Sequence, residues 1–221
     1  AAAEADVQIV AGDTKVVERG SGDGVFICTT GIGYRPKGMN IGGASAKPGD
    51  AVLFSGTIGD HGMAVLTARG DLGLETDIQS DVAPLNHLLK NLASSTPHIH
   101  VLRDPTRGGL ATTLNEISLQ SNVGIILDED RIPIDPAVRS TCEILGFDPL
   151  YVANEGKVII ILPENEVDQA LDCLVKEDYG KLATRIGTIT SENPGRVLLK
   201  TIIGGTRILD MLSGEMLPRI C

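Results

Sequence analysis

The sequence predicts a layered protein of the α/β or α+β class, with about one and a half domains. Three observations lead to this expectation: the length, the alternation of strand-like and helix-like segments, and an aliphatic core. The chain has 221 residues, whereas one domain ordinarily has about 100–200. Hydrophobic residues make up 42% of the chain and aromatic residues 3%, so the core is expected to be aliphatic and disorder is not expected. Strands that alternate with helices indicate layered α/β or α+β packing.

The first fifty residues predict strands and turns. Residues 7–11 are mostly apolar and predict a short buried strand, and residues 16–33 predict two strands around the glycine-rich turn at 20–24. Residues 34–50 end in Lys47-Pro48-Gly49-Asp50, a turn sequence that suits a domain junction.

The remainder predicts alternating strands and helices. Residues 157–162 are almost wholly apolar, which predicts a central strand covered on both faces. Asp81 is expected to cap a helix over 82–94, and Asp135-Pro136 to start a helix that reaches Leu145. The other expected helices cover residues 60–69, 106–119 and 164–177, and the other expected strands cover 51–59, 99–102, 123–127, 183–190 and 196–203.

The charge balance bears on possible partners. The chain has 29 acidic and 19 basic residues, which gives a net charge of −10. Such a protein repels nucleic-acid backbones, so a nucleic-acid partner is not expected. ATP remains possible, because Mg²⁺ and backbone N–H groups can hold phosphates. Neither a membrane span nor a signal peptide is recognisable in the sequence, so we expect a soluble, cytoplasmic protein.

The four cysteines show no metal-like spacing. Cys28, Cys142 and Cys173 lie in apolar surroundings and are interpreted as small buried residues. Cys221 is the last residue and could sit on a mobile arm that carries a covalent cargo to a distant site. Its own α-carboxylate disfavours the thiolate, so an active role needs a basic partner or a metal. An incidental terminal cysteine is the alternative.

Three polar motifs are candidates for chemistry, each with a plain structural alternative. Gly12-Asp13-Thr14-Lys15 follows a predicted strand and suits Mg²⁺ and phosphate, or is a simple turn. The segment 104–109 starts a helix with two glycines, which makes an anion site or a capped helix. Asn154-Glu155-Gly156-Lys157 precedes the apolar strand and suits acid–base work, or is an ordinary loop. Among the histidines, His98 and His100 are expected at the surface.

Several motifs together resemble the HypE family of hydrogenase maturation proteins. This family of carbamoyl dehydratases belongs to an ATP-binding superfamily with aminoimidazole ribonucleotide synthetase, selenophosphate synthetase and thiamine-monophosphate kinase. The ending Leu217-Pro218-Arg219-Ile220-Cys221 separates it from those relatives. The other matching stretches are residues 10–17, 29–33, 47–50, 55–62, 103–109, 114–117 and 153–157.

The resemblance implies an architecture. Residues 1–46 would be the second part of an N-terminal ATP-binding domain, ferredoxin-like and forming a β-barrel on dimerisation, whose first part is missing here. Residues 47–205 would be an α/β C-terminal domain related to aminoimidazole ribonucleotide synthetase, and residues 206–221 a mobile tail that carries the terminal cysteine.

The resemblance also implies a chemistry. A carbamoyl group on Cys221 would be dehydrated with ATP and Mg²⁺ to a thiocyanate, which supplies the cyanide ligand of a [NiFe]-hydrogenase iron. Lys15 and Glu155 match the positions that would remove protons, and Asp13 matches the metal and nucleotide motif. The further nucleotide contacts implied or suggested by the motifs are Thr14, Asp104, Thr106, Arg107, Gly108 and Asn154.

The implied partners are the carbamoyltransferase HypF, a HypC–HypD scaffold complex that carries iron, and a second copy of the chain. Two other functions stay open. One is a small-molecule kinase or synthetase of the same superfamily, which would not need Cys221. The other is a non-catalytic module that docks maturation partners.

Overall fold

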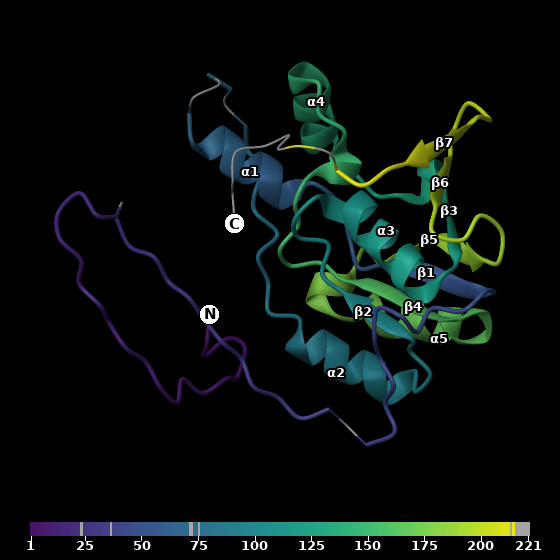
Figure 1. The fold of residues 1–221 in the computed structure, drawn as a ribbon, viewed down its shortest axis with the longest axis horizontal. Coiled ribbons are helices and arrows are strands. Elements are labelled where there is room, and N and C mark those ends of the chain that lie inside the picture. The colour runs from purple at the N-terminus through teal and green to yellow at the C-terminus, as the bar shows by residue number, and fades with distance from the viewer. Residues whose placement is uncertain (23, 36, 71–72, 75, 213, 215–221) are drawn as a thin grey trace.

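A seven-stranded sheet forms the centre of the structure, with strand order β2-β4-β1-β5-β3-β6-β7. The computed structural model describes residues 1–22, 24–35, 37–70, 73–74, 76–212 and 214. The strands are β1 (Asp50–Phe54), β2 (Val101–Arg103), β3 (Gly124–Asp128), β4 (Ile159–Pro163), β5 (Thr184–Thr190), β6 (Val197–Lys200) and β7 (Thr206–Leu209). The α-helices are α1 (Asp60–Ala68), α2 (Asn86–Ser95), α3 (Gly109–Ser121), α4 (Pro136–Leu145) and α5 (Val167–Leu174). Short 3₁₀ segments cover Glu129–Arg131, Pro149–Tyr151, Glu164–Glu166 and Asp178–Gly180. The mixed α+β class predicted from the sequence is confirmed (Figure 1).

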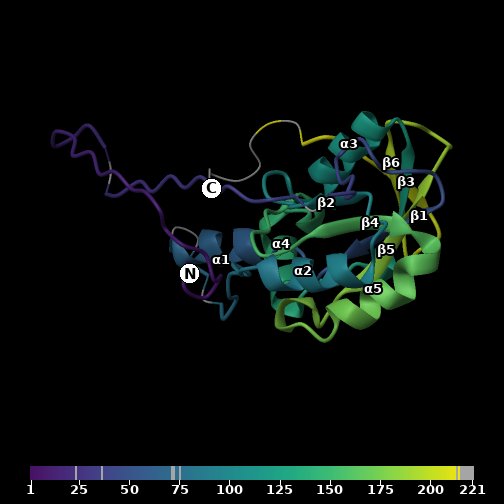
Figure 2. The ribbon, with the colours of Figure 1, turned by 90° about the horizontal axis from the view of Figure 1, so that it is seen from below.

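Helices cover both faces of the sheet, with α3 on one side and α2 and α5 on the other (Figure 2). Side chains of β1 alternate between the two faces, as the period of a strand requires. Val52 and Phe54 join the core under α3, whereas Ala51 and Leu53 join the core under α2 and α5.

Strand β4 confirms the prediction of a strand covered on both faces, because its residues 159–162 are 0% exposed. It lies between β2 and β1 and is antiparallel to both. The pairing of Phe54 with Ile159 brings the end of β1 beside the start of β4. The segments that follow β1 and precede β4 therefore meet at one edge of the sheet.

Helices α1 and α4 pack together outside the sheet around Met63, Val138, Cys142 and Val152. Asp135 caps α4 as predicted, since its carboxylate accepts the N–H of Ala137 at 2.8 Å. Burial raises the pKa of the Cys142 thiol to about 11, which fits its expected role as a small buried residue.

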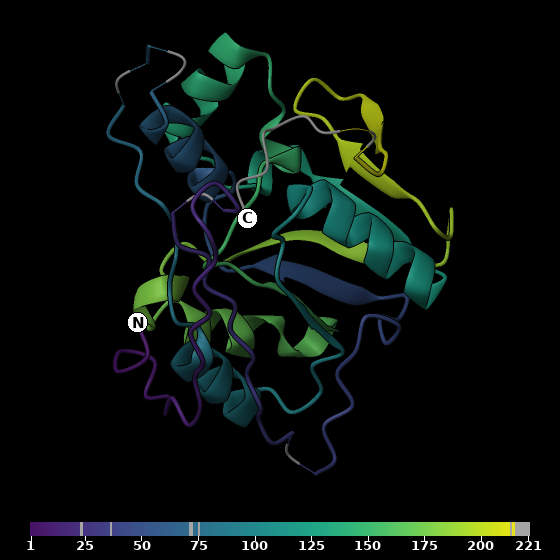
Figure 3. The same cartoon turned by 60° about the vertical axis from the view of Figure 1, so that its left-hand side comes forward.

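The predicted strands at 7–11 and 16–33 are wrong for this chain. The described residues of 7–35 contain no helix or strand and are all exposed, and they extend away from the sheet as the purple trace in Figures 1 and 2, which comes forward in Figure 3. A strand needs a neighbouring strand to take up its N–H and C=O groups, and no described segment pairs with these residues. Cys28 is exposed for the same reason, against expectation.

Three smaller differences concern individual boundaries and side chains. Helix α2 begins at Asn86, so Asp81 does not cap it. Residues 206–209, expected in the tail, form β7 on the edge of the sheet. His98 is exposed as expected, but the His100 side chain is only 15% exposed because its Nδ1 lies 2.8 Å from Asp50 Oδ2. No helix in the described part of the chain is long and apolar enough to cross a membrane.

Candidate functional site

The edge where β1 ends and β4 begins gathers polar side chains from three segments. Residues 55–61 follow β1 into α1, residues 154–158 lead into β4, and residues 80–83 cross beside both. Ser55 joins the first two segments, since its hydroxyl accepts the N–H of Val158 at 3.0 Å and its N–H donates to the Val158 carbonyl at 3.2 Å.

Lys157 forms a buried ion-pair cluster with two carboxylates. Its Nζ lies 3.4 Å from Asp60 Oδ2 and 3.5 Å from Asp81 Oδ2. The side chains of Lys157 and Asp60 are each 13% exposed and that of Asp81 is 2% exposed, so water screens these charges poorly. Burial raises the pKa of Asp60, while a hydrogen bond from the Thr57 hydroxyl and the charge of Lys157 oppose the rise.

Glu155 is held by its backbone rather than by its side chain. Asp81 Oδ1 accepts the N–H of Glu155 at 3.0 Å. The next residue is Gly156, where a Cβ atom would lie 1.8 Å from the carbonyl oxygen of Asp81, so only glycine allows this approach. The Glu155 side chain remains 30% exposed. A carboxylate fixed at its base and open at its tip can meet a bound substrate.

Asn154 ties the Glu155 segment to its surroundings. It is 0% exposed, and its Oδ1 accepts the N–H of Gly59 at 2.7 Å. Its Nδ2 donates to the carbonyl oxygens of Pro105 and Val152, each at 3.1 Å. These bonds give Asn154 a structural role at the site; its contact with a nucleotide stays a prediction.

His61 lies on the other side of Glu155. Its Nδ1 is 2.9 Å from the Ser80 hydroxyl and its Nε2 is 4.0 Å from Glu155 Oε1. Within the described residues, His61 Nε2 and Asp81 Oδ2 are the buried side-chain atoms that lack a hydrogen-bond partner.

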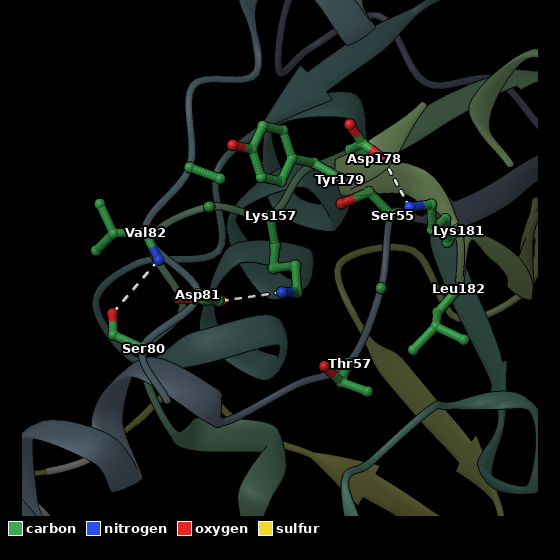
Figure 4. Close-up of a pocket in the computed structure, with 13 residues that line it drawn as sticks. Ser55, Thr57, Ser80, Asp81, Val82, Lys157, Asp178, Tyr179, Lys181 and Leu182 are labelled. Atoms are coloured by element: carbon green, nitrogen blue, oxygen red, sulfur yellow. Dashed lines mark hydrogen bonds and ion pairs between the residues drawn. The ribbon is translucent and has the colours of Figure 1, made fainter. Parts of the chain in front are cut away.

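A pocket of about 530 Å³ opens beside this cluster. Figure 4 shows Lys157 reaching toward Asp81, with Lys181 and Leu182 on the other side and Tyr179 above. The pocket offers an ammonium group and hydroxyl groups next to the buried carboxylates, which are groups suited to a polar or anionic substrate.

The start of α3 has the turn geometry that the sequence indicated, but its glycines have packing reasons of their own. Gly108 and Gly109 have φ of 75° and 63°, and a Cβ on Gly109 would lie 2.6 Å from the carbonyl oxygens of Leu150 and Val152. Asp104 and Thr106 bond to each other at 2.7 Å. Arg107 and Asp104 are exposed, and a phosphate contact there stays a prediction.

The Asp13-Thr14-Lys15 motif is not brought to Glu155. All three residues are exposed on the extended segment, and Asp13 Oδ1 accepts the N–H of Thr14 at 2.9 Å. The described residues contain no group of three His, Cys, Asp or Glu side chains able to hold a metal ion. Asp13 as a metal ligand stays a prediction. Cys221 lies outside the described residues.

The sequence pointed to Glu155 and Asn154 and included Lys157 in the same motif without giving it a role, but it missed Asp60, His61 and Asp81 as site residues. The position of Lys157 two residues after Glu155 was a usable signal for it. Asp81 gave none, because its sequence context favours a helix cap.

The chain matches known proteins over its whole length. Residues 47–200 match the family model "AIR synthase related protein, C-terminal domain". Two curated relatives are named "Carbamoyl dehydratase HypE": that of Cupriavidus necator is 54% identical over 221 residues, and that of Azotobacter vinelandii is 51% identical over 221 residues. Both matches take in 100% of this chain, which spans 63% and 65% of those proteins.

The chain is also similar to solved structures of HypE proteins. A crystal structure of the hydrogenase maturation protein HypE is 44% identical, with a TM-score of 0.89 over 100% of this chain and 70% of that one. A HypE in complex with ATP is 48% identical, with a TM-score of 0.77 over 82% of this chain and 55% of that one. A HypE–HypF complex is 47% identical, with a TM-score of 0.75 over 78% of this chain and 56% of that one.

Proposed function

The chain belongs to the HypE family of hydrogenase maturation proteins, and from this premise we propose that it serves the ATP-dependent dehydration of a carbamoyl group carried by Cys221. The product is a thiocyanate, whose cyano group becomes the cyanide ligand of a [NiFe]-hydrogenase iron. The name of the curated relatives supports the reaction class, and the ATP complex of a structural relative supports the nucleotide.

The reaction has two parts. The carbamoyl oxygen attacks the γ-phosphorus of ATP, so an O–P bond forms and ADP leaves with the electrons of the broken P–O bond. The nitrogen gives up one proton and a C=N bond results. The C–O bond then breaks, phosphate leaves, and loss of the second N–H proton completes the C≡N bond. Each proton needs a base near the nitrogen.

The observation that carries this proposal is the placement of Glu155. Its backbone is fixed by Asp81 and by the close approach at Gly156, its side chain is 30% exposed, and the next two residues, Gly156 and Lys157, line the pocket. This is the arrangement that a base for a bound carbamoyl group needs. We assign one proton transfer to Glu155. Lys15 is proposed as a second base, which requires its segment to approach Glu155.

The nucleotide contacts are proposed from the family motifs. Arg107 and the N–H groups at the start of α3, near Gly108, would contact phosphates, with Asp104 and Thr106 beside them. Asp13 and Thr14 would contact the nucleotide from the extended segment, with Mg²⁺ at Asp13. Asn154 would support this side through the bonds that hold Gly59 and Pro105.

The partners are proposed from the same relationship. A HypE–HypF complex among the structural relatives supports HypF as the donor of the carbamoyl group. A HypC–HypD complex with iron would receive the cyano group. We further propose a homodimer that works in the cytoplasm.

Intact-mass spectrometry tests the proposal. A full-length form of the protein is incubated with ATP and the HypF carbamoylation system, and the spectrum is followed with time. We expect a carbamoyl adduct that then loses one water. Glu155→Gln should retain the carbamoyl adduct without losing water, because an amide cannot accept the proton. Glu192→Gln, on an exposed turn, is the matched control and should behave as wild type.

Two further results discriminate the alternatives. Cys221→Ser should abolish both adducts; ATP turnover with a small molecule that survives this change would favour a kinase or synthetase. Calorimetry without detectable ATP binding would favour a docking module. A dehydrated adduct in Glu155→Gln would remove Glu155 from the mechanism.

A further inference from the structure

The dehydration removes two protons from one nitrogen, yet the described structure brings only one of the two proposed bases into the site. Glu155 lies in the cluster, whereas Lys15 is exposed on the extended segment. A carboxylate that has taken one proton must pass it on before it can take another. The inference below rests on the proposed function and concerns the group that receives this proton.

His61 is the residue placed for that task. Its side chain is 10% exposed, and its Nε2 is buried 4.0 Å from Glu155 Oε1. Among the described residues this nitrogen has no hydrogen-bond partner. A buried ring nitrogen without a partner is costly unless a partner arrives during function. A movement of the Glu155 carboxylate by about 1 Å toward His61 would bring Oε1 within hydrogen-bond distance of Nε2.

The backbone fixes His61 relative to Glu155. The N–H of Gly62 donates to the Ala153 carbonyl at 3.0 Å, and the N–H of Gly59 donates to Asn154 Oδ1 at 2.7 Å. The first turn of α1 is thus bonded on both sides of His61 to the segment that carries Glu155. The separation of the two side chains is therefore set by the framework.

Ser80 defines the other side of the ring. Its oxygen lies 2.9 Å from His61 Nδ1 and also accepts the N–H of Val82 at 3.3 Å. When Nδ1 carries the proton and donates it to Ser80 Oγ, Nε2 has its lone pair free for Glu155.

The other charged side chains near His61 form ion pairs with one another. Asp60 precedes it on α1, and Asp81 and Lys157 come from the two segments packed against the helix. Lys157 pairs with both carboxylates. In the described cluster, His61 Nε2 is therefore the unpartnered nitrogen that faces Glu155.

We propose that His61 acts through Glu155 as a proton relay in the dehydration. The Glu155 O–H bond breaks and an N–H bond forms at His61 Nε2, which gives an imidazolium and restores the carboxylate. While Lys15 lies away from the site, as it does in the described structure, the restored Glu155 then takes the second proton of the carbamoyl nitrogen in place of Lys15. His61 returns its proton to solvent, and no oxidant or reductant takes part.

The test uses a full-length form of the protein, loaded with the carbamoyl group, and follows water loss by intact mass after ATP is added, at several pH values. The rate for the wild type should fall toward low pH, because imidazolium cannot accept a proton. His61→Gln should lower the rate by about 100-fold and move the low-pH decrease to lower pH, where a carboxylate rather than an imidazole takes up a proton, while carbamoyl loading and ATP affinity stay unchanged. Exogenous imidazole should restore part of the rate to His61→Ala but not to His61→Gln, which leaves less space.

A second variant and a control distinguish the loss of a proton relay from a loss of rate caused by a disturbed structure. Ser80→Ala keeps the imidazole, so it should be slowed less than His61→Gln and should keep the low-pH decrease. His87→Gln, on the exposed side of α2, should match the wild type. If the wild type dehydrates the carbamoyl group and His61→Gln does so at the same rate with the same pH profile, the relay is refuted but the proposed function is not. If the carbamoylated wild type never loses water, both the proposed function and the relay are refuted.

Discussion

Replacing Lys157 by Met should destabilise the chain far more than the loss of an exposed lysine. Methionine keeps most of the side-chain volume and removes the ammonium group from between Asp60 and Asp81. Two carboxylates with side chains 13% and 2% exposed are then left without their cation.

The magnitude follows from the distances. At an effective dielectric constant of about 20, two unit charges 3.4 Å apart attract by about 5 kcal/mol, and the cost of burying the ammonium offsets part of this. Removal of one partner from a buried pair typically costs about 3–5 kcal/mol. For a chain of this size that corresponds to a fall of roughly 6–20 °C in Tm.

Urea unfolding followed by circular dichroism at neutral pH measures the effect. Lys181→Met is the matched control, because it removes the same charge from a pair with side chains 65% and 84% exposed, where no measurable loss is expected. The loss in Lys157→Met should shrink as the pH is lowered, since burial raises the pKa of Asp60 and this carboxylate then becomes neutral. Equal stability of the two variants would refute the view that Lys157 neutralises a buried charge cluster.

Three further predictions concern the same edge of the sheet. Gly156→Ala should cost about 1–3 kcal/mol or more in urea unfolding, because its Cβ would lie 1.8 Å from the Asp81 carbonyl oxygen; wild-type stability would show that the segments move apart freely. Asn154→Ala should cost about 2–4 kcal/mol by the same measurement, because the buried N–H of Gly59 and the buried carbonyl of Val152 lose the side chain that bonds them, whereas the Pro105 carbonyl keeps the backbone N–H of residue 154; a loss below about 1 kcal/mol would mean that water replaces the amide. Burial raises the folded-state pKa of Asp60 above its ordinary value of 3.8. The window between the unfolded-state and the folded-state pKa is therefore the pH range in which ionisation of Asp60 destabilises the fold as the pH rises. Asp60→Asn cannot ionise, so its stability relative to the wild type should increase with pH across the window in a pH series of unfolding curves, and a decrease would contradict the sign.

Local signals in the sequence were sufficient for much of the fold. The apolar run of β4 and the Asp135-Pro136 start of α4 each depend on neighbouring residues, and both were predicted close to their observed bounds. The strands expected before residue 34 failed because an apolar, alternating segment is only half of a strand. The other half is a partner, and the described chain does not supply one.

The candidate site was only partly predictable for a related reason. Glu155 could be found because its motif precedes a buried strand and matches a family position to which the resemblance gives a role, whereas the local letters alone left an ordinary loop open. Asp60, Asp81 and Lys157 lie far apart in the chain, and only the pairing of β1 with β4 and the path of residues 80–83 bring them together. The sequence context of Asp81 favours a helix cap, and nothing local shows that its carboxylate instead accepts the N–H of Glu155.

The burial of β1 and β4 on both faces has a consequence for how the two strands align. When one face of a strand is apolar and the other polar, a slip by one residue exposes the wrong side chains and is rejected. Residues 51–54 and 159–162 are 0% exposed on either face, so burial gives little discrimination between neighbouring alignments. Polar contacts at the strand ends must then set the alignment, and the reciprocal bonds of Ser55 with Val158 are such contacts. The hydrogen bonds at this edge thus fix the register of β1 against β4. The same register sets the position of the segment that carries Glu155.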